Sequence, residues 1–321
     1  MTSPVSCHVF GPVPSRRLGR SLGVDLVPFK TCTYDCVYCQ LGRTTDRTVT
    51  RRDYVPVDTV LADLRRTLAT CTPDCVTISG SGEPTLHAYI GELVTIIKKE
   101  TTLPVAVLTN GSLLWDSAVQ DALLSADMVL PSLDAGDGEM FRHVNRPHPA
   151  ISFDRMVEGL VEFRHRYGGA LWLEVLLLGG MTALDAEVAK IAAVARRIRP
   201  DRVQLNTVTR PPAEDFAFAV PHADMQRFCH AFEGNCEMIA DYHGPAGMED
   251  TRACDRDVIE LLRRRPCTVD DIAHGLGLHP TQAAKAVAHI RDEGGIAEER
   301  VGGRVYFSME RPTRDGKGGR Q

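Results

Sequence analysis

Short apolar runs alternate along the chain with longer segments in which apolar residues recur every three or four positions. The runs have strand length, are rich in valine, isoleucine and leucine, and lie at residues 22–28, 75–79, 104–109, 127–133, 171–178 and 202–208. Helical periodicity occupies the intervals, near residues 57–68, 86–100, 152–167 and 183–198, with a short helix from about Asp116. The pattern therefore predicts six strand–helix alternations.

The predicted strands are apolar on both faces, which is typical of parallel strands covered by helices. Right-handed crossovers between successive strands would curl such a sheet into a barrel. Six units fall short of the eight that close a (β/α)8 barrel. We therefore predict an α/β fold with a partial (β/α)6 barrel in a first domain at residues 1–245. Periodicity alone leaves a flat, doubly wound sheet open.

A smaller second domain is predicted at residues 246–310, followed by a polar tail at residues 311–321. Three helical patterns precede a hairpin in this region, and they lie at residues 255–265, 268–278 and 279–294. The hairpin is expected around Gly302 and Gly303. Three helices and a two-stranded wing predict a winged helix–turn–helix.

The third helix of this predicted motif has a mixed charge. It carries Lys285 and Arg291, but also Asp292 and Glu293, which makes a poor surface for phosphate groups. A packing or dimerisation module and a nucleic-acid-binding module both remain open for this domain.

Composition and charge narrow the function classes. The 321 residues are 43% hydrophobic and 25% charged, enough for a sizeable core. The net charge of −5 argues against a basic nucleic-acid binder that uses the whole chain. The first 17 residues contain no apolar run of signal-peptide length, and the most apolar stretch, residues 170–181, is too short to span a bilayer. We expect a cytoplasmic protein without membrane association, whose ten cysteines are thiols or ligands, not disulfides.

Three cysteines lie within eight residues of the loop after the first predicted strand: Cys32, Cys36 and Cys39. A structural zinc site normally needs four protein ligands, and a [4Fe–4S] cluster usually takes four thiolates. A group of three leaves one iron of such a cluster open to an outside ligand. Tyr38, next to the third cysteine, would supply an aromatic wall. The alternative is three buried apolar cysteines.

The C-x3-C-x2-C spacing with an aromatic before its last cysteine resembles the radical S-adenosylmethionine (SAM) superfamily. Residues 79–84 (SGSGEP) resemble that family's GGEP-type segment, whose backbone holds the SAM amino group. Residues 109–111 (TNG) resemble its segment near the ribose, and residues 132–134 (SLD) end the fourth strand where polar ribose contacts often occur. The resemblance covers roughly residues 15–210.

The resemblance implies a [4Fe–4S] cluster on the three cysteines and SAM as the second cofactor. It implies that an electron from the cluster cleaves SAM to a 5′-deoxyadenosyl radical, which takes hydrogen from a substrate. An external electron donor of the flavodoxin or ferredoxin type is then needed. The implied SAM-contacting residues are Tyr38, Gly82, Glu83, Pro84, Asn110, Ser132, Asp134, Glu174, Gln204 and Asn206. Gly82 fits this role because a residue without a β-carbon lets a ligand approach the backbone.

Within the superfamily, residues 12–42, 132–148 and 204–212 resemble the group related to tRNA wyosine-base synthases. That group carries a second cluster on three further upstream cysteines, whereas only Cys7 precedes the triplet here. It also holds pyruvate as a Schiff base on a lysine, and Lys30 lies beside the triplet. The alternative for Lys30 is a surface lysine or one that contacts an anion.

The candidate catalytic residues are Lys30, Asn145, Arg146 and Arg210. Two interpretations are left open for the basic residues Arg16, Arg17 and Arg20: binding of phosphate or RNA, or a solvated or salt-bridged segment. An auxiliary cluster on Cys229, Cys236, Cys254 and Cys267 is also left open.

Two functions of different class follow from these features. The first is a radical SAM enzyme that acts on tRNA, a nucleoside or a small metabolite. The alternative is an iron–sulfur redox regulator that binds DNA through the winged helix. The SGSGEP and TNG segments favour the enzyme, because a sensor has no need to bind SAM.

Overall fold

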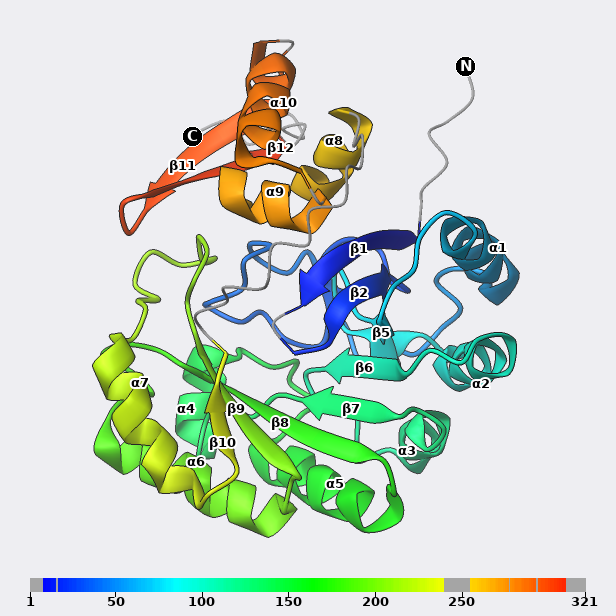
Figure 1. Ribbon diagram of the computed structural model, residues 1–321. Coiled ribbons are helices and arrows are strands. Elements are labelled where there is room, and N and C mark those ends of the chain that lie inside the picture. The colour runs from blue at the N-terminus through cyan, green and yellow to red at the C-terminus, as the bar shows by residue number, and fades with distance from the viewer. Residues whose placement is uncertain (1–7, 16, 240–254, 277, 293, 310–321) are drawn as a thin grey trace, which may run out of the picture. The chain divides into compact units, whose positions relative to one another are not determined.

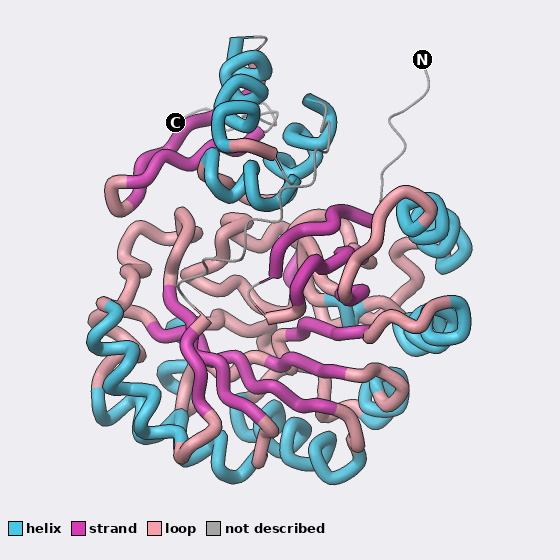
Figure 2. The backbone as a smooth tube through the Cα atoms, viewed as in Figure 1, coloured by secondary structure: helices cyan, strands magenta, loops and turns pink. Residues whose placement is uncertain are grey.

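A computed structural model describes residues 8–15, 17–239, 255–276, 278–292 and 294–309 of the chain (Figures 1 and 2). The chain divides into two compact units, Met1–Pro245 and Ala246–Gln321, and each is described by itself.

The first unit is built on an eight-stranded sheet with the strand order β1-β2-β5-β6-β7-β8-β9-β10. The strands are β1 (Val9–Ser15), β2 (Gly19–Val24), β5 (Cys75–Ile78), β6 (Val105–Thr109), β7 (Met128–Pro131), β8 (Ala170–Leu177), β9 (Arg202–Thr207) and β10 (Cys236–Met238). Every neighbouring pair is parallel except the antiparallel hairpin of β1 and β2. The predicted α/β fold with a mostly parallel sheet is therefore confirmed.

Helices cover the outer side of this sheet (Figure 1). They are α1 (Val57–Leu68), α2 (Ile90–Glu100), α3 (Ser117–Leu123), α4 (Gly138–Val144), α5 (Phe153–Arg166), α6 (Asp185–Ile198) and α7 (His222–Cys229), with short 3-10 turns η1 (Pro84–Leu86) and η2 (His230–Phe232). In α2 the apolar face carries the fully buried Leu93, Val94 and Ile97. Side-chain caps fix two starts: Asp116 accepts from the Ala118 N–H at α3, and Ser152 accepts from the Arg155 N–H at α5.

Some predicted boundaries are wrong. The strand expected at residues 22–28 runs from Gly19 to Val24, and the residue after it, Asp25, accepts hydrogen bonds from the Ser81 N–H and hydroxyl through its carboxylate. The helix expected from residue 86 begins at Ile90, after the 3-10 turn η1. Strands β1 and β10 were not predicted, so the sheet is wider than six strands. Helices α4 and α7 were not predicted either.

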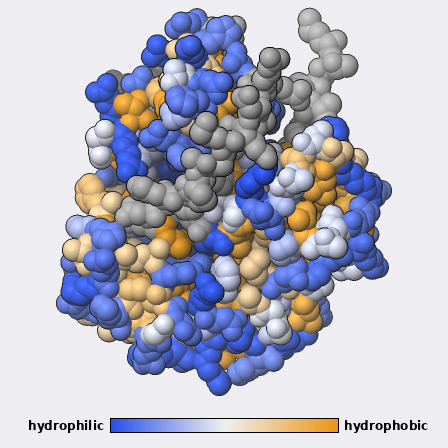
Figure 3. All heavy atoms as spheres, viewed as in Figure 1, coloured by the Kyte–Doolittle hydropathy of each residue, from blue (hydrophilic) through white to orange (hydrophobic). Residues whose placement is uncertain are grey.

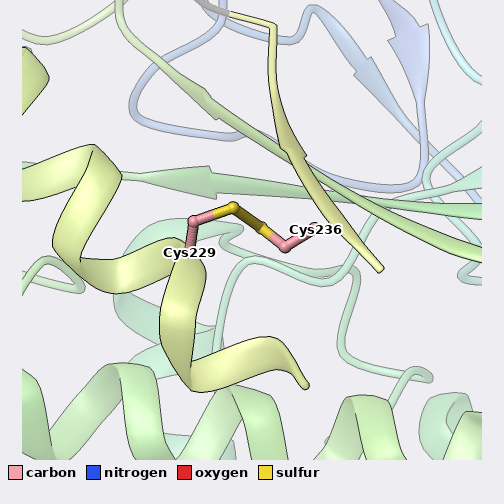
Figure 4. The surroundings of a disulfide bond; sticks show 2 residues. All are labelled: Cys229 and Cys236. Atoms are coloured by element: carbon pink, nitrogen blue, oxygen red, sulfur yellow. A yellow bond between two sulfur atoms is a disulfide. The ribbon is translucent and has the colours of Figure 1, made fainter. Parts of the chain in front are cut away.

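A disulfide joins Cys229, at the end of α7, to Cys236, at the start of β10 (Figure 4). Their Cα atoms lie 5.6 Å apart, inside the usual range for a disulfide. The expectation of free thiols is wrong for this pair, and these two sulfurs cannot ligate an auxiliary cluster while bonded to each other. Cys7 and Cys254 lie outside the described residues.

Within its described residues, the second unit contains three helices and a hairpin. They are α8 (Asp255–Arg264), α9 (Val269–Leu276), α10 (Pro280–Asp292), β11 (Ile296–Val301) and β12 (Arg304–Met309), with the two strands antiparallel. The Thr268 hydroxyl accepts from the Asp271 N–H at 3.1 Å and caps α9. Val258, Leu262, Ile272 and Val287 are buried within this unit. Glu293 and the predicted tail at residues 311–321 lie outside the described residues.

On the face drawn in Figure 3, hydrophilic and hydrophobic residues are interspersed over the surface. Across the part of the chain that the structure describes, none of the helices has both the length and the apolar character needed to cross a membrane.

Candidate active site

Three free thiols lie in the segment that follows β2 and contains the short parallel pair β3 (Thr31–Cys32) and β4 (Asp46–Arg47). Cys32 ends β3, and Cys36 and Cys39 follow it. The loop after β5 joins this segment through the Glu83 N–H, which donates to the Thr31 carbonyl at 3.1 Å. The polar residues after β5, β6 and β7 meet the cysteines because the carboxyl ends of parallel strands share one edge of the sheet.

Each of the three sulfurs accepts a hydrogen bond from a different N–H donor. The pairs are Lys30 Nζ with Cys39 Sγ at 3.1 Å, Asn110 Nδ2 with Cys32 Sγ at 3.6 Å, and Asn145 Nδ2 with Cys36 Sγ at 3.6 Å. The donors come from the cysteine segment itself, from the end of β6 and from the end of α4. Three of the residues named as candidates from the sequence are thus adjacent to the thiols.

Burial disfavours the charged thiolate form of two of these cysteines and so raises their pKa. Desolvation raises the pKa of the Cys32 thiol to about 12, and the nearby Glu83 carboxylate adds to the effect. Desolvation also raises the pKa of Cys36 well above its ordinary value, with Cys32 and Asp134 contributing. Since a thiol must lose its proton to bind iron, a bound cation is needed to compensate the thiolate charges.

Glu83 is a fully buried hydrogen-bond acceptor that joins the loops after β5 and β6. Its Oε1 accepts from the Thr85 N–H and hydroxyl and from the Thr109 hydroxyl at 2.6 Å. Its Oε2 accepts from the Asn110 N–H at 2.7 Å. Burial raises the pKa of this carboxyl, and the hydrogen bonds oppose that shift. The carboxylate therefore orients Asn110, which in turn contacts Cys32.

Position 82 needs a glycine because its backbone packs closely against another part of the protein. From the sequence, a glycine was predicted here for a different reason, the close approach of a ligand. A β-carbon at this position would lie 1.8 Å from the Thr31 carbonyl oxygen. The space that the sequence suggested for a ligand is occupied by the strand that leads to Cys32. Pro84 follows as the first residue of η1 and is buried.

A second polar cluster lies beside Cys36, around Asp134. Asp134 Oδ2 accepts from the Tyr38 hydroxyl at 2.5 Å and from Asn145 Nδ2 at 2.8 Å, while Oδ1 accepts from the Leu176 N–H. Burial raises the pKa of Asp134 to about 6, although these hydrogen bonds oppose the shift. Ser132, before it, forms a β-bridge with Glu174 of β8.

Two buried polar atoms in this cluster have no hydrogen-bond partner among the described residues. They are the hydroxyl of Tyr34, a residue between the first two cysteines in the sequence, and Oδ1 of Asn145. Both side chains are 2% exposed. A buried polar atom without a partner is costly, so these two atoms point to a polar group that completes the site when bound.

The remaining predicted SAM-contacting residues, Glu174, Gln204 and Asn206, lie on strands β8 and β9 and belong to one polar network. Arg17 Nη1 pairs with Glu174 Oε2 at 2.7 Å and lies 3.3 Å from Gln204 Oε1. Glu174 Oε1 accepts from Asn206 Nδ2 at 3.0 Å, and Gln204 donates to Glu237. Arg17 is thus engaged in an internal ion pair, which agrees with the salt-bridged alternative for this basic segment. Arg16 lies outside the described residues.

The two candidate arginines lie on loops around the cysteines. Arg146 has a left-handed backbone with a φ of 46°, and its Nη1 pairs with Glu214 Oε1 at 2.5 Å. Arg43, from the cysteine segment, pairs with the same carboxylate at 3.0 Å. Arg210 Nη1 lies 3.2 Å from Gln40 Oε1. Glu214 therefore joins three loops, a role that sequence reasoning missed together with Tyr34.

No set of three or more His, Cys, Asp or Glu side chains converges as ligands of one metal ion within the described ranges. A [4Fe–4S] cluster does not need such convergence, because each thiolate binds a different iron of the cubane.

Comparison with known families gives one match. The model of the radical SAM superfamily matches residues 26–192, which include the three cysteines and the loops after β5, β6 and β7.

Several curated proteins are similar over most of the chain. A UPF0026 protein of Helicobacter pylori is 34% identical over 272 residues, 82% of this chain and 86% of that protein. A UPF0026 protein of Methanocaldococcus jannaschii is 36% identical over 64% of this chain and 65% of its own length. A Brachyspira hyodysenteriae protein named GTPase Obg is 38% identical over 94% of this chain. That alignment spans 45% of the Brachyspira protein.

Solved structures share the fold at low sequence identity. A radical SAM methyltransferase of Sphaerobacter thermophilus superposes with a TM-score of 0.55 at 19% identity, over 68% of this chain and 65% of that one. SuiB of Streptococcus suis, bound to S-adenosylmethionine, gives a TM-score of 0.52 at 16% identity, over 74% and 54%.

Proposed function

The chain belongs to the radical SAM superfamily, and from this premise we propose that Cys32, Cys36 and Cys39 hold the [4Fe–4S] cluster that its chemistry requires. It is a radical SAM enzyme, whose superfamily uses that cluster together with SAM. The observation that carries the proposal is the set of three free thiols, each with its own N–H donor, at the carboxyl edge of the parallel sheet.

The residues present suit a cluster with one open iron. Donors to the sulfurs are what a thiolate-ligated cluster uses to stabilise its negative charge. The unpartnered Tyr34 hydroxyl and Asn145 Oδ1 support a further polar ligand beside the cysteines. When bound, the reduced cluster supplies the electron that splits SAM into methionine and the 5′-deoxyadenosyl radical, which abstracts a hydrogen atom from substrate.

The chain's own residues would bind and orient SAM. The Gly82 carbonyl and Asn110 would contact its amino acid and ribose ends, with Glu83 acting by fixing Asn110 and Pro84 by stiffening the turn. Tyr38, Ser132 and Asp134 would line the part of the site beside Cys36. Glu174, Gln204 and Asn206 would act from the sheet interior through the network with Arg17.

The test is anaerobic reconstitution of the wild-type chain and of Cys36→Ala, with Cys71→Ala as the control, since Cys71 is a free cysteine outside the triplet. We expect wild type and the control to bind iron, to change their electron paramagnetic resonance (EPR) spectrum on SAM addition, and to release 5′-deoxyadenosine on reduction. Cys36→Ala should lose all three. Iron binding that survives Cys36→Ala, or a wild-type spectrum indifferent to SAM, would contradict the proposal.

The substrate classes remain tRNA, a nucleoside and a small metabolite, and the resemblance to the wyosine-related group supports the first. Comparison of tRNA nucleosides and metabolites between a deletion strain and its parent tests this.

We propose a flavodoxin or ferredoxin as the electron donor, because reduction of the cluster needs an external low-potential partner.

We also propose that the second unit is a winged helix–turn–helix, supported by the order of α8, α9, α10 and the β11–β12 hairpin. The alternative function, a DNA-binding redox regulator, has weak support. Lys285 is exposed on α10, but the exposed charges of the wing are balanced, with Glu298 and Glu299 against Arg300 and Arg304. Salt-dependent DNA binding that Lys285→Ala weakens would favour the regulator.

A further inference from the structure

Lys30 is a buried lysine whose ammonium contacts a cysteine sulfur. Lys30 is 3% exposed, and its Nζ lies 3.1 Å from Cys39 Sγ. Among the described residues, that sulfur is its hydrogen-bond partner, and its Nζ forms no ion pair with a carboxylate. The other two cysteines receive their hydrogen bonds from neutral amides, so Cys39 is distinguished by a charged donor.

The backbone holds Lys30 in this place at a conformational cost. Its φ is 59°, in the left-handed region where glycine is favoured over a long side chain. Its N–H donates to the Ser81 carbonyl at 2.8 Å, and its own carbonyl accepts from the Thr45 and Asp46 N–H groups at 3.2 Å. An unfavourable backbone held by three hydrogen bonds points to a function for the side chain that it positions.

A buried ammonium needs a compensating negative charge. Three thiolates on a [4Fe–4S] cubane outweigh the positive charge of its core, and reduction adds one more negative charge. A positive charge at the sulfur of Cys39 is attracted more strongly to the reduced cluster than to the oxidised one. Burial limits the screening of that attraction by water and salt.

We propose that Lys30, acting through Cys39, raises the reduction potential of the cluster and so makes its reduction by the external donor easier. The inference rests on the proposed cluster site. It assigns Lys30 a positioning role and not the Schiff base suggested by the wyosine-related group. A Schiff base would require the neutral amine to leave the sulfur and face a carbonyl substrate.

The experiment is an EPR-monitored redox titration of the anaerobically reconstituted full chain. The variants are Lys30→Met, which removes the charge and the donor, Lys30→Gln, which keeps an N–H donor, and Lys30→Arg, which keeps both. Lys98→Met is the control, because Lys98 is a partly exposed lysine of α2 that pairs with Asp127. Iron content and circular dichroism establish that each variant is folded and loaded.

We expect the midpoint potential to shift to more negative values in Lys30→Met, to shift less in Lys30→Gln, and to stay near wild type in Lys30→Arg and Lys98→Met. Equal potentials in loaded wild type and loaded Lys30→Met and Lys30→Gln would overturn the inference while leaving the cluster site intact. Borohydride trapping of pyruvate on Lys30 in the loaded wild type would also overturn it. Absence of a cluster from wild type would instead refute the proposed function.

Discussion

Position 82 has room for a hydrogen atom and nothing larger. The Thr31 carbonyl oxygen occupies the place of a β-carbon, and the next residue, Glu83, donates its N–H to the same oxygen. The loop after β5 is therefore locked, backbone to backbone, onto the strand that ends at Cys32. Any side chain at position 82 would push the first cysteine away from the sheet edge.

Gly82→Ala should lower the free energy of unfolding by about 1–3 kcal/mol, as expected for forcing a methyl group into packed structure, and should reduce iron bound after reconstitution. Gly168→Ala is the matched control, because a β-carbon there meets no atom within 4 Å. Urea unfolding and iron analysis of both variants measure the effect. Equal iron binding by Gly82→Ala and wild type would show that the cysteine segment tolerates the displacement.

Residue roles were predictable from the sequence where the signal is local. The cysteine spacing and the SGSGEP and TNG segments each fall within a few positions, and the structure brings all three together. Arg17 and Glu174 are 157 positions apart, and their ion pair leaves no local pattern. The link between Glu214 and Arg146 spans 68 positions and was missed for the same reason.

At the scale of elements, long periodic segments were predictable and short or irregular ones were not. Helix α1 and strands β6 and β8 lie within one or two residues of their predicted bounds. Strand β1 contains Pro12 and Pro14, which argue against a strand, but an edge strand tolerates proline because it pairs on only one side. Strand β10 has three residues, too few for periodicity to detect.

His87 connects three elements through its buried ring. Nε2 lies 2.9 Å from the Val55 carbonyl, before α1, and Nδ1 accepts from the Tyr89 N–H, before α2, at 3.2 Å. These contacts require the neutral tautomer, with the proton on Nε2. Burial lowers the pKa of His87, and the Arg51 charge lowers it further. A protonated ring would carry an N–H at Nδ1 as well, so Nδ1 could no longer accept the hydrogen bond from the Tyr89 N–H.

Acidification should therefore destabilise the first unit through His87. The unfolded chain has a histidine pKa of about 6.5, and the folded pKa is lower. Between these two values the unfolded state binds more protons, so the free energy of unfolding falls as the pH falls below about 6.5. Urea unfolding at pH 7.5 and pH 5.5 measures this slope.

The dependence of the free energy of unfolding on pH should weaken in His87→Gln. It should persist in His165→Gln, because His165 is exposed on α5. An unchanged slope in His87→Gln would assign the acid sensitivity to other groups.

At the scale of the whole molecule, the chain has two units with separate cores. The apolar core of the first unit extends from Val9 to Phe232 and packs against Cys32 and Cys36. The second unit buries its own residues, including Val258, Ile272, Val287 and Ile290. The proposed cofactor site consists entirely of residues from the first unit. Binding energy from the cofactors should therefore act on one unit only.

Calorimetry of the full chain should resolve this separation as two unfolding transitions. Reconstitution of the cluster and addition of SAM under anaerobic conditions should raise the midpoint of one transition, because ligands that bind the folded state stabilise the unit that holds them. The other midpoint should not move, since every residue proposed for the site belongs to the first unit. Cys36→Ala, treated identically, serves as the control and should show neither midpoint moving. A single transition that shifts as a whole on loading would show that the two units unfold cooperatively, and the separation of their stabilities would then be wrong.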